Sequence, residues 1–576
     1  MKKIYLTLPL IFIAGILHEQ PSGACTNFLV TKGASVNGST MITYSADSHQ
    51  LYGELYFWPA RDYPAGTMLD VYEWDTGRHM GKIPQVAHTY TVVGNMNEHQ
   101  LAIGETTYGG IEGLVDTSAI IDYGSLIYIT LQRARNAREA IKVISGLVSS
   151  YGYASEGESF SIADPDEAWI LEIIGKGNGN KGAVWVARRI PDGYVSGHAN
   201  QARIRTFPLA TGKKNSISIS SKDLSRINDP VVECVYARDV IDFARSKNLF
   251  SGKDEEFSFS DTFNPVNFSG ARFCEVRVWS FFKSVNNNME QYYNYASGHN
   301  LENRMPLWIK PDRKLSNGDM MNFMRDHLEG TPLDMRKDIG AGPFGLPYRW
   351  RPLEWRVSID KSGPEYCNER ATSTQQTGFV FVAECRSWLP DPIGGIFWFG
   401  VDDAATTVFT PMYCGITRVP DCFKTGNGDM LTYSSTSAFW LFNQVANFCY
   451  LRYDSMSTDA IKVQKELEKS YIGGTVSVDK AAMELFNKNE NEAREYLTDY
   501  SLKSAANTFK RWKSLSEYLL VKYIDGNIKR EKDGKFERNK WGNPVMPSQP
   551  GYPDKWKESV IRDTGDKLLV PAGPGH

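Results

Sequence analysis

Cys25 combines a thiol with a position at which a new N-terminus could be made. Two lysines precede a mostly apolar run over residues 4–17, and a Ser-Gly-Ala segment ends at Ala24. An apolar run of this length is typical of a signal peptide and is too short to span a membrane. We therefore expect cleavage after Ala24, which would place the thiol and a free α-amine on the same residue.

An N-terminal cysteine can carry its own general base. The pKa of an α-amine is about 7.7 to 8, against about 10.4 for lysine, so at neutral pH it is often neutral enough to take the thiol proton. The thiolate would attack a carbonyl carbon, and the amine would return the proton to the leaving group. Two other interpretations of Cys25 stay open from these residues: a lipidated cysteine, because Gly-Ala-Cys is the end of a bacterial lipobox, and a structural cysteine.

The residues after Cys25 predict a β-hairpin over 26–44, because two strand-like runs flank an Asn-Gly turn signal. If the turn is centred on the Asn-Gly pair, Cys25 lies opposite Gln50. If the loop is longer, Cys25 lies opposite Ala46. In both registers the chain returns Asp47 to the neighbourhood of Cys25. The hairpin alone thus brings a carboxylate towards the candidate nucleophile.

The rest of the chain mixes strands and helices without regular alternation. Helical spacing covers 126–148, with a start near 122–125, and strand-like segments occur at 89–94, 101–106, 159–164, 168–174 and 183–189. This pattern favours an α+β or layered-sheet protein. The glycine-rich segment 175–182 lies between two strands and no helix follows it, so we interpret it as a hairpin turn rather than a phosphate loop.

The C-terminal part changes character twice. Helical spacing dominates from about 458 to 523, and from residue 527 the chain is charged and then rich in Pro and Gly. We expect four segments: a leader (1–24), a catalytic domain (25–457), a helical extension (458–526) and a polar surface tail (527–576).

Composition excludes several classes of protein. The 576 residues carry 64 Lys and Arg against 67 Asp and Glu, and a net charge of −3 provides no basic field for a nucleic acid. No apolar stretch after the leader is long enough for a transmembrane segment. The seven cysteines other than Cys25 form no recognised disulfide framework, and without CxxC or HExxH the sequence predicts neither a metal site nor a cofactor.

Several blocks together resemble the PepD-type cysteine dipeptidases, N-terminal-nucleophile hydrolases related to penicillin V acylase and bile-salt hydrolase. The resemblance runs from Cys25 to about residue 525. It rests on Cys25-Thr-Asn-Phe-Leu-Val, Gly104-Glu-Thr-Thr, Phe160-Ser-Ile-Ala-Asp-Pro-Asp-Glu-Ala-Trp, His198-Ala-Asn-Gln-Ala-Arg and Ser269-Gly-Ala-Arg-Phe. It implies a four-layer α-β-β-α sandwich with Cys25 at the end of a central strand and a helical C-terminal extension.

The resemblance also implies roles for individual residues. Cys25 corresponds to the nucleophile, Asp47 to the carboxylate that holds its α-amine, and Asn200 to the oxyanion-hole amide. Arg272 corresponds to the arginine near the thiolate. Three of these residues also have an ordinary structural interpretation. Asp47 could be a turn residue, Asn200 a loop amide and Arg272 the partner in a structural ion pair.

Other positions are less well determined. A backbone N–H near Thr106 or Thr107 would complete the oxyanion hole next to the substrate. Arg203 and Arg277 are alternatives to Arg272. Where many relatives carry an arginine at the end of the second strand, this chain has Tyr44, which leaves stabilisation of the thiolate to Arg272 or to the Tyr44 hydroxyl.

The resemblance implies an exported, periplasmic or extracellular dipeptidase that takes small peptides, needs no cofactor and could form a homo-oligomer. In that case removal of the leader would itself create the active amine. Two alternatives remain: an acylase for non-peptide amides of the bile-salt or penicillin type, and a lipidated surface protein that binds ligands without cutting them.

Overall fold

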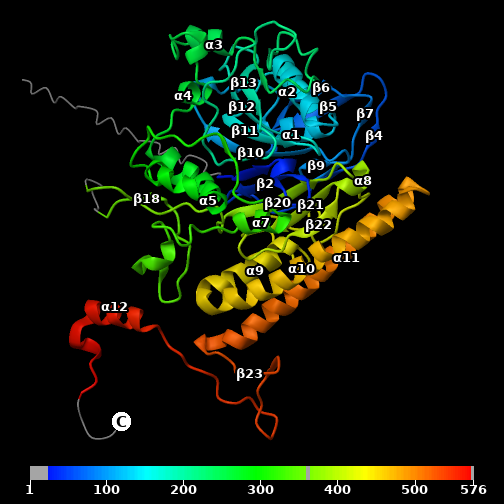
Figure 1. Cartoon of the computed structure of the whole chain (residues 1–576). Helices are drawn as coiled ribbons and strands as arrows, with labels where there is room; N and C mark the ends of the chain where they lie inside the picture. Colours follow the sequence, from blue (N-terminus) through cyan, green and yellow to red (C-terminus); the bar gives the residue numbers. More distant parts are fainter. Residues whose placement is uncertain (1–23, 358–362, 572–576) are drawn as a thin grey trace, which may run out of the picture.

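Two large β-sheets form the centre of the protein (Figure 1). The computed structural model describes residues 24–357 and 363–571, so the expected leader lies outside the described residues except for Ala24. Helices cover the outer faces of both sheets. The predicted α+β class is therefore confirmed.

The first sheet has seven strands and carries Cys25 at the start of its third. The order is β17 (Trp308–Ile309), β14 (Val195–His198), β1 (Asn27–Val30), β2 (Thr40–Asp47), β20 (Thr377–Cys385), β21 (Ile396–Val401) and β22 (Thr410–Tyr413). Nearly all of its residues are buried, as expected for a sheet covered on both faces.

The second sheet has nine strands and faces the first through β10 and β11, which contact β2. Its order is β15 (Ser218–Ser220), β16 (Cys234–Tyr236), β13 (Ala183–Arg189), β12 (Ala168–Gly175), β11 (Gly157–Ala163), β10 (Ala102–Gly109), β9 (Met96–Asn97), β8 (Val92–Val93) and β3 (Phe57–Trp58). The glycine-rich segment joins the antiparallel strands β12 and β13, which confirms the predicted hairpin turn.

The pairing of β1 with β2 decides between the two expected registers of the hairpin. Leu29 pairs with Ile42 and Val30 with Met41, and an isolated bridge joins Thr26 to Ser45. This is the register of the longer loop, which places Cys25 opposite Ala46, and the Gln50 register is wrong. Asp47, the last residue of β2, lies one position further on.

Two helices cover the nine-stranded sheet where one was expected. The first, α1 (Tyr123–Leu131), begins after Asp122, whose side chain accepts a hydrogen bond from the Ser125 N–H. The second, α2 (Ala137–Tyr151), begins after Asn136, which caps the Glu139 N–H in the same way. A side-chain cap satisfies the free N–H groups of a first turn, so Asn136 starts a new helix inside the predicted span.

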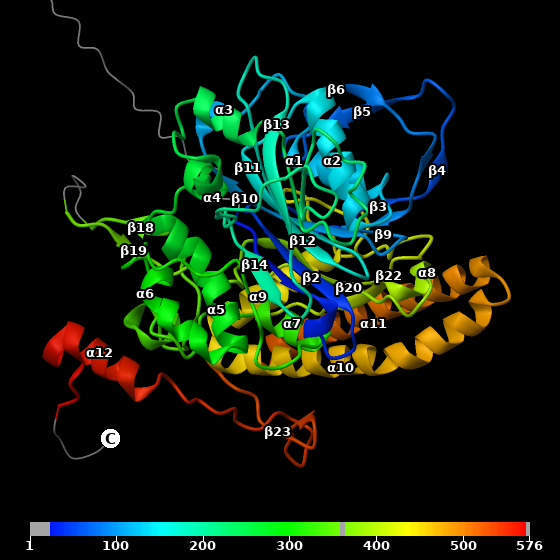
Figure 2. The same ribbon diagram turned by 45° about the horizontal axis from the view of Figure 1, so that its top comes forward.

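Three helices cover the seven-stranded sheet on the opposite side of the molecule (Figures 1 and 2). These are α9 (Ala438–Leu451), α10 (Tyr453–Phe486) and α11 (Glu490–Tyr523). Leu467, Tyr471 and Trp512 of these helices are buried. The helical character of this segment is confirmed, and the two long helices form an antiparallel pair.

Shorter elements surround this core. The remaining helices are α3 (Val240–Ser246), α4 (Phe259–Phe263), α5 (Val276–Val285), α6 (Tyr293–Ala296), α7 (Asn317–Phe323) and α8 (Asp391–Gly394). Small two-stranded pairs are β4 (Arg61–Asp62) with β7 (His88–Thr89), β5 (Met68–Tyr72) with β6 (His79–Pro84), and β18 (Glu354–Trp355) with β19 (Tyr366–Cys367).

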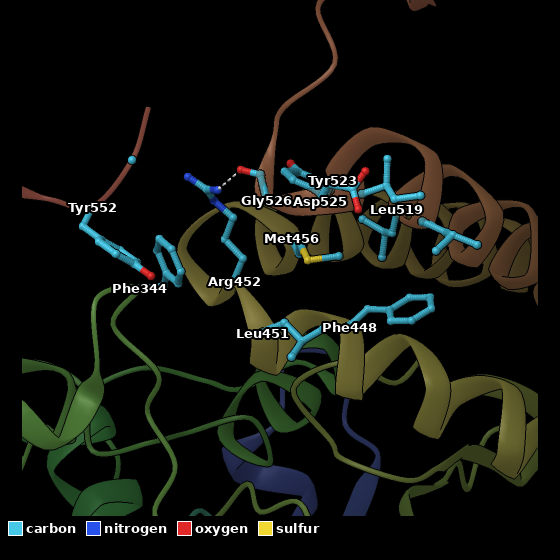
Figure 3. A pocket seen from close by; sticks show the side chains of 13 residues that line it. Phe344, Phe448, Leu451, Arg452, Met456, Leu519, Tyr523, Asp525, Gly526 and Tyr552 are labelled. Carbon is cyan, nitrogen blue, oxygen red and sulfur yellow. Dashed lines mark hydrogen bonds between the residues drawn. The ribbon is translucent and has the colours of Figure 1, made fainter. Parts of the chain in front are cut away.

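The C-terminal tail lies on the surface, as expected. It contains the pair β23 (Glu531–Lys532) and β24 (Lys535–Phe536) and the helix α12 (Asp554–Thr564), in which no residue is buried. Figure 3 shows where the tail passes the ends of α9, α10 and α11: Tyr552 and Phe344 lie beside Arg452 at the edge of an apolar pocket.

Candidate active site

Cys25 lies two residues before β1, and it lines a cavity of about 450 Å³ that extends between the two sheets. The residue is 8% exposed. Its Sγ lies 3.5 Å from Glu105 Oε1, on β10 of the opposite sheet, and 3.7 Å from the Tyr44 hydroxyl on β2. The thiol is thus enclosed, yet it faces a space that can hold a small molecule.

Asn200 lies beside Cys25, and its expected role in the oxyanion hole stays a prediction. Its Oδ1 accepts a hydrogen bond of 2.8 Å from the Cys25 backbone N–H, and its Nδ2 donates to the Thr107 carbonyl at 2.6 Å. The residue has a φ of 61°, a left-handed conformation that asparagine tolerates better than most residues. In this geometry the Asn200 oxygen holds the Cys25 nitrogen, and its N–H₂ group is directed at a backbone carbonyl.

Asp47 also lies at the cavity, but its carboxylate is engaged elsewhere. Oδ2 pairs with Arg370 at 2.6 Å, and Oδ1 accepts a hydrogen bond from the Thr377 hydroxyl at 2.7 Å. Ala24 still precedes Cys25 in this structure, and the Ala24 N–H donates to the Asp47 carbonyl. The Cys25 nitrogen is therefore a peptide nitrogen here, and the predicted contact between Asp47 and a free amine stays a prediction.

The arginine beside Cys25 is Arg277. Its NH1 group donates to the Cys25 carbonyl at 2.6 Å and to the Thr26 hydroxyl, and its NH2 group donates to Asn200 Oδ1 at 3.0 Å. Arg277 is buried on α5, and burial lowers its pKa to about 10. It fixes the backbone on both sides of the candidate nucleophile.

Arg272 occupies a different place from the one the resemblance implies. Its guanidinium pairs with Glu369, with Nε 2.8 Å from Oε2, and it donates to the Ser297 carbonyl. No described contact joins it to Cys25. The π-helical segment Gly270–Glu275, which leads into α5, directs Arg272 at Glu369, whereas Arg277 contacts the Cys25 backbone. Arg203 also points elsewhere, because it pairs with the buried Glu275 at 2.8 Å.

The two threonines differ in exposure to the cavity. Thr107 lines it, and its hydroxyl donates to Glu158 Oε1 at 2.7 Å. Thr106 is fully buried and is not part of the lining; its hydroxyl shares a hydrogen bond of 2.7 Å with His198. Of the two, Thr107 is placed to touch a bound molecule.

Glu105 and Glu158 are two further residues at the cavity that residue patterns did not indicate. Glu105 belongs to the Gly104-Glu-Thr-Thr block, but strand periodicity assigns a residue to a face of a sheet without saying what lies opposite. Tyr44 donates a hydrogen bond to Glu105 Oε1. The tyrosine at the position of the family arginine therefore contacts a carboxylate of the opposite sheet.

Burial and negative charge keep the thiol protonated. Burial raises the pKa of Cys25 well above its usual range, and the carboxylates of Glu105 and Asp47 raise it further. Because the reactive form of cysteine is the thiolate, this thiol needs a base within reach. The nearest nitrogen is the one held by Asn200, which would become an amine once Ala24 is removed.

Within residues 24–357 and 363–571, no group of three or more His, Cys, Asp and Glu side chains is arranged to hold a metal ion. In the same part of the chain, no helix combines the length and apolarity needed to cross a membrane. All eight cysteines lie in this part and are free thiols.

Comparison with known proteins defines the class. The model of peptidase family C69 matches residues 54–466, most of the chain, so the protein belongs to this family of peptidases. The resemblance to PepD-type enzymes is therefore confirmed at the level of the family. The matched segment begins after Cys25 and Asp47.

Individual relatives are distant but align over most of their length. A probable dipeptidase of Latilactobacillus sakei is 23% identical over 496 residues, covering 82% of this chain and 90% of the relative. A probable dipeptidase B of Streptococcus pyogenes serotype M1 is 22% identical, covering 92% and 98%. A probable dipeptidase of Salmonella dublin is 22% identical, covering 68% and 81%.

Proposed function

We propose that this peptidase hydrolyses dipeptides through a thioester on Cys25, activated by the α-amine of the same residue. The observation that carries the proposal is the position of Cys25: its Sγ faces the cavity while its nitrogen is held by Asn200. The names of the relatives support the dipeptide substrate.

The proposed reaction starts with the amine of the mature Cys25 taking the thiol proton. The sulfur attacks the carbonyl carbon of the first residue, and the amine then gives the proton to the leaving nitrogen. Asn200 Oδ1 and Arg277 hold the Cys25 backbone in place. Water enters through the cavity and hydrolyses the thioester, which restores the thiol.

We further propose that the fold is the four-layer sandwich of N-terminal-nucleophile hydrolases. The support is the sequence of layers: α1 and α2, the nine-stranded sheet, the seven-stranded sheet, then α9 to α11 (Figure 1). Cys25, two residues before the central strand β1, lies near the position expected for the nucleophile. Export and cleavage after Ala24 are proposed from the leader pattern alone.

Replacement of Cys25 tests the mechanism. Cys25→Ala should keep the fold and lose at least about 1000-fold in kcat, because no other described thiol faces the cavity. Cys422→Ser is the matched control, since this partly buried thiol lies outside the cavity lining and its loss should leave the rate unchanged. Full activity in a folded Cys25→Ala protein would exclude the thioester.

A further inference from the structure

Two buried glutamates on neighbouring strands face the cavity beside Cys25. Glu105 on β10 is 2% exposed and Glu158 on β11 is fully buried, and both line the cavity. Each uses one oxygen: Glu105 Oε1 accepts from Tyr44, and Glu158 Oε1 accepts from Thr107. The Oε2 atom of each accepts no hydrogen bond from an N–H or O–H group of the described residues.

Two buried carboxyl groups side by side are costly to ionise. Burial raises the pKa of Glu105, and burial together with Glu105 raises the pKa of Glu158 well above its usual range. The two Oε2 atoms can satisfy each other only by sharing a proton, because two ionised carboxylates side by side repel. A bound cation would satisfy both.

The other charged side chains that line the cavity are mostly acidic, like Glu105 and Glu158. The lining also includes the carboxyl groups of Glu73, Asp75, Asp122 and Glu156, against a single described cationic side chain, that of Arg78. Arg78 lies at the exposed rim, where it is 3.7 Å from Glu73. The interior of the cavity therefore lacks a counter-ion of its own.

The distance between Glu105 and the Cys25 sulfur indicates which cation the two glutamates could bind. In an amino acid the α-nitrogen lies about 2.5 Å from the carbonyl carbon, because two bonds of standard length join them through Cα. Cys25 Sγ must bond to that carbon, and Glu105 Oε1 lies 3.5 Å from Sγ. An α-ammonium on the attacked residue can thus reach Glu105, and Glu158 lies diagonally across from Glu105 on the neighbouring strand β11.

We propose that Glu105 and Glu158 bind the free α-ammonium of the substrate's first residue. The inference rests on the proposed function, since it needs Cys25 as the nucleophile. An ammonium has three N–H donors and no acceptor, so it can donate to both Oε2 atoms at once. The subsite therefore selects peptides with an unblocked amine and places the first carbonyl carbon, and no later one, at the thiol.

The test compares alanyl-alanine with propionyl-alanine, which differs by the absence of the amine. A site built to bind an N–H group rejects an analogue that lacks it, because its polar atoms are left unpaired. We expect kcat/KM for propionyl-alanine to be at least about 100-fold lower in the wild-type enzyme. Lysyl-alanine serves as a probe for binding of a side-chain cation instead.

Glu158→Gln tests the residue, because Glu158 has no contact with the thiol. It should reduce the preference for alanyl-alanine at least about 10-fold while the rate with propionyl-alanine changes little. Glu112→Gln is the matched control: it removes the same charge from an exposed position outside the cavity lining and should leave the preference intact.

The outcomes separate this inference from the proposed function. Equal rates with both substrates would overturn the subsite and leave Cys25 hydrolysis standing, whereas hydrolysis of neither would overturn both. A strong preference for lysyl-alanine, with alanyl- and propionyl-alanine equal, would assign the carboxylates to a side chain instead. If Glu158→Gln slows both substrates equally, the glutamate acts only in the fold and the assignment fails.

Discussion

At the scale of residues, the contacts around Cys25 divide into two sets. Asn200 and Arg277 bond to its backbone, whereas Tyr44 and Glu105 lie against its sulfur. The first set positions the proposed nucleophile, and the second determines the charge around its sulfur. Tyr44 belongs to the same hairpin as Cys25, whereas Glu105, Asn200 and Arg277 come from segments far away in the sequence.

The two arginines of the 270–277 segment provide a matched comparison. Arg277 donates to four oxygens around Cys25 and Asn200, a pattern that the compact ammonium of lysine cannot reproduce. We expect Arg277→Lys to lower kcat at least about 100-fold and Arg272→Lys to lower it less than about 10-fold. Steady-state kinetics on folded proteins, checked by circular dichroism, measure this; a larger loss from Arg272→Lys would restore the role that the resemblance implied.

Part of this site could be predicted. The hairpin pattern brought Asp47 near Cys25, and the resemblance to the PepD-type family implied a role for Asn200. The choice between Arg272 and Arg277 could not be made from sequence, because both lie in one helical stretch and only packing decides which faces β1. The positions of Glu105 and Glu158 beside Cys25 could not be predicted, because they depend on how the second sheet packs against the first.

At the scale of elements, His198 links the two sheets. It ends β14 of the seven-stranded sheet, and its ring bonds to Thr106 on β10 and Ser161 on β11 of the other sheet, at 2.7 and 2.8 Å. Burial lowers its pKa to about 3, with Arg203 contributing, so the ring is neutral in the folded protein. Asn200 follows two residues later, so the link also anchors the loop that holds Cys25.

This link predicts a loss of stability in mild acid. In the unfolded chain His198 takes a proton below its ordinary pKa of about 6.5, whereas in the folded protein it stays neutral down to about pH 3. The folded state therefore binds fewer protons between these values, and the contribution of His198 falls as the pH drops. From pH 7 to pH 5 we expect a decrease of about 2 kcal/mol in the free energy of unfolding.

Urea unfolding of the wild type and His198→Gln at both pH values measures this effect. The variant lacks the titrating ring and should lose about 2 kcal/mol less between pH 7 and pH 5. An equal loss in both proteins would contradict the assignment. If the variant is too unstable to compare, the imidazole resonances of His198 provide the same test, because they should not titrate over this range.

Element boundaries were predictable where local signals are strong. The Asp122 cap, the strands flanking the glycine-rich turn and the long C-terminal helices follow from side-chain patterns within each segment. The break between α1 and α2 was missed because apolar spacing continues across it, although Asn136 is a capping residue. The length of the loop between β1 and β2 could be determined only from the observed pairing of the two strands.

At the scale of the whole molecule, the cavity exists because two sheets face each other and helices close both outer sides. Cys25, the proposed nucleophile, lies two residues before β1, β2 supplies Tyr44 and Asp47, and β10 and β11 supply the two glutamates. Such a site depends on pairings across 80 or more positions of the chain, for example Cys25 with Glu105. Sequence patterns of a few residues carry no information on those pairings, which is why the class of fold was predictable and half of the site was not.

The central claim is that Cys25 acts as a free N-terminal nucleophile, and peptide mapping by mass spectrometry tests it most directly. The enzyme is mixed with alanyl-alanine, quenched in acid during turnover and digested. We predict an N-terminal peptide that begins at Cys25 with an unmodified amine, part of it carrying one alanyl group on the sulfur. A chain that begins elsewhere, an acylated amine, or an alanyl group on another residue would contradict the account.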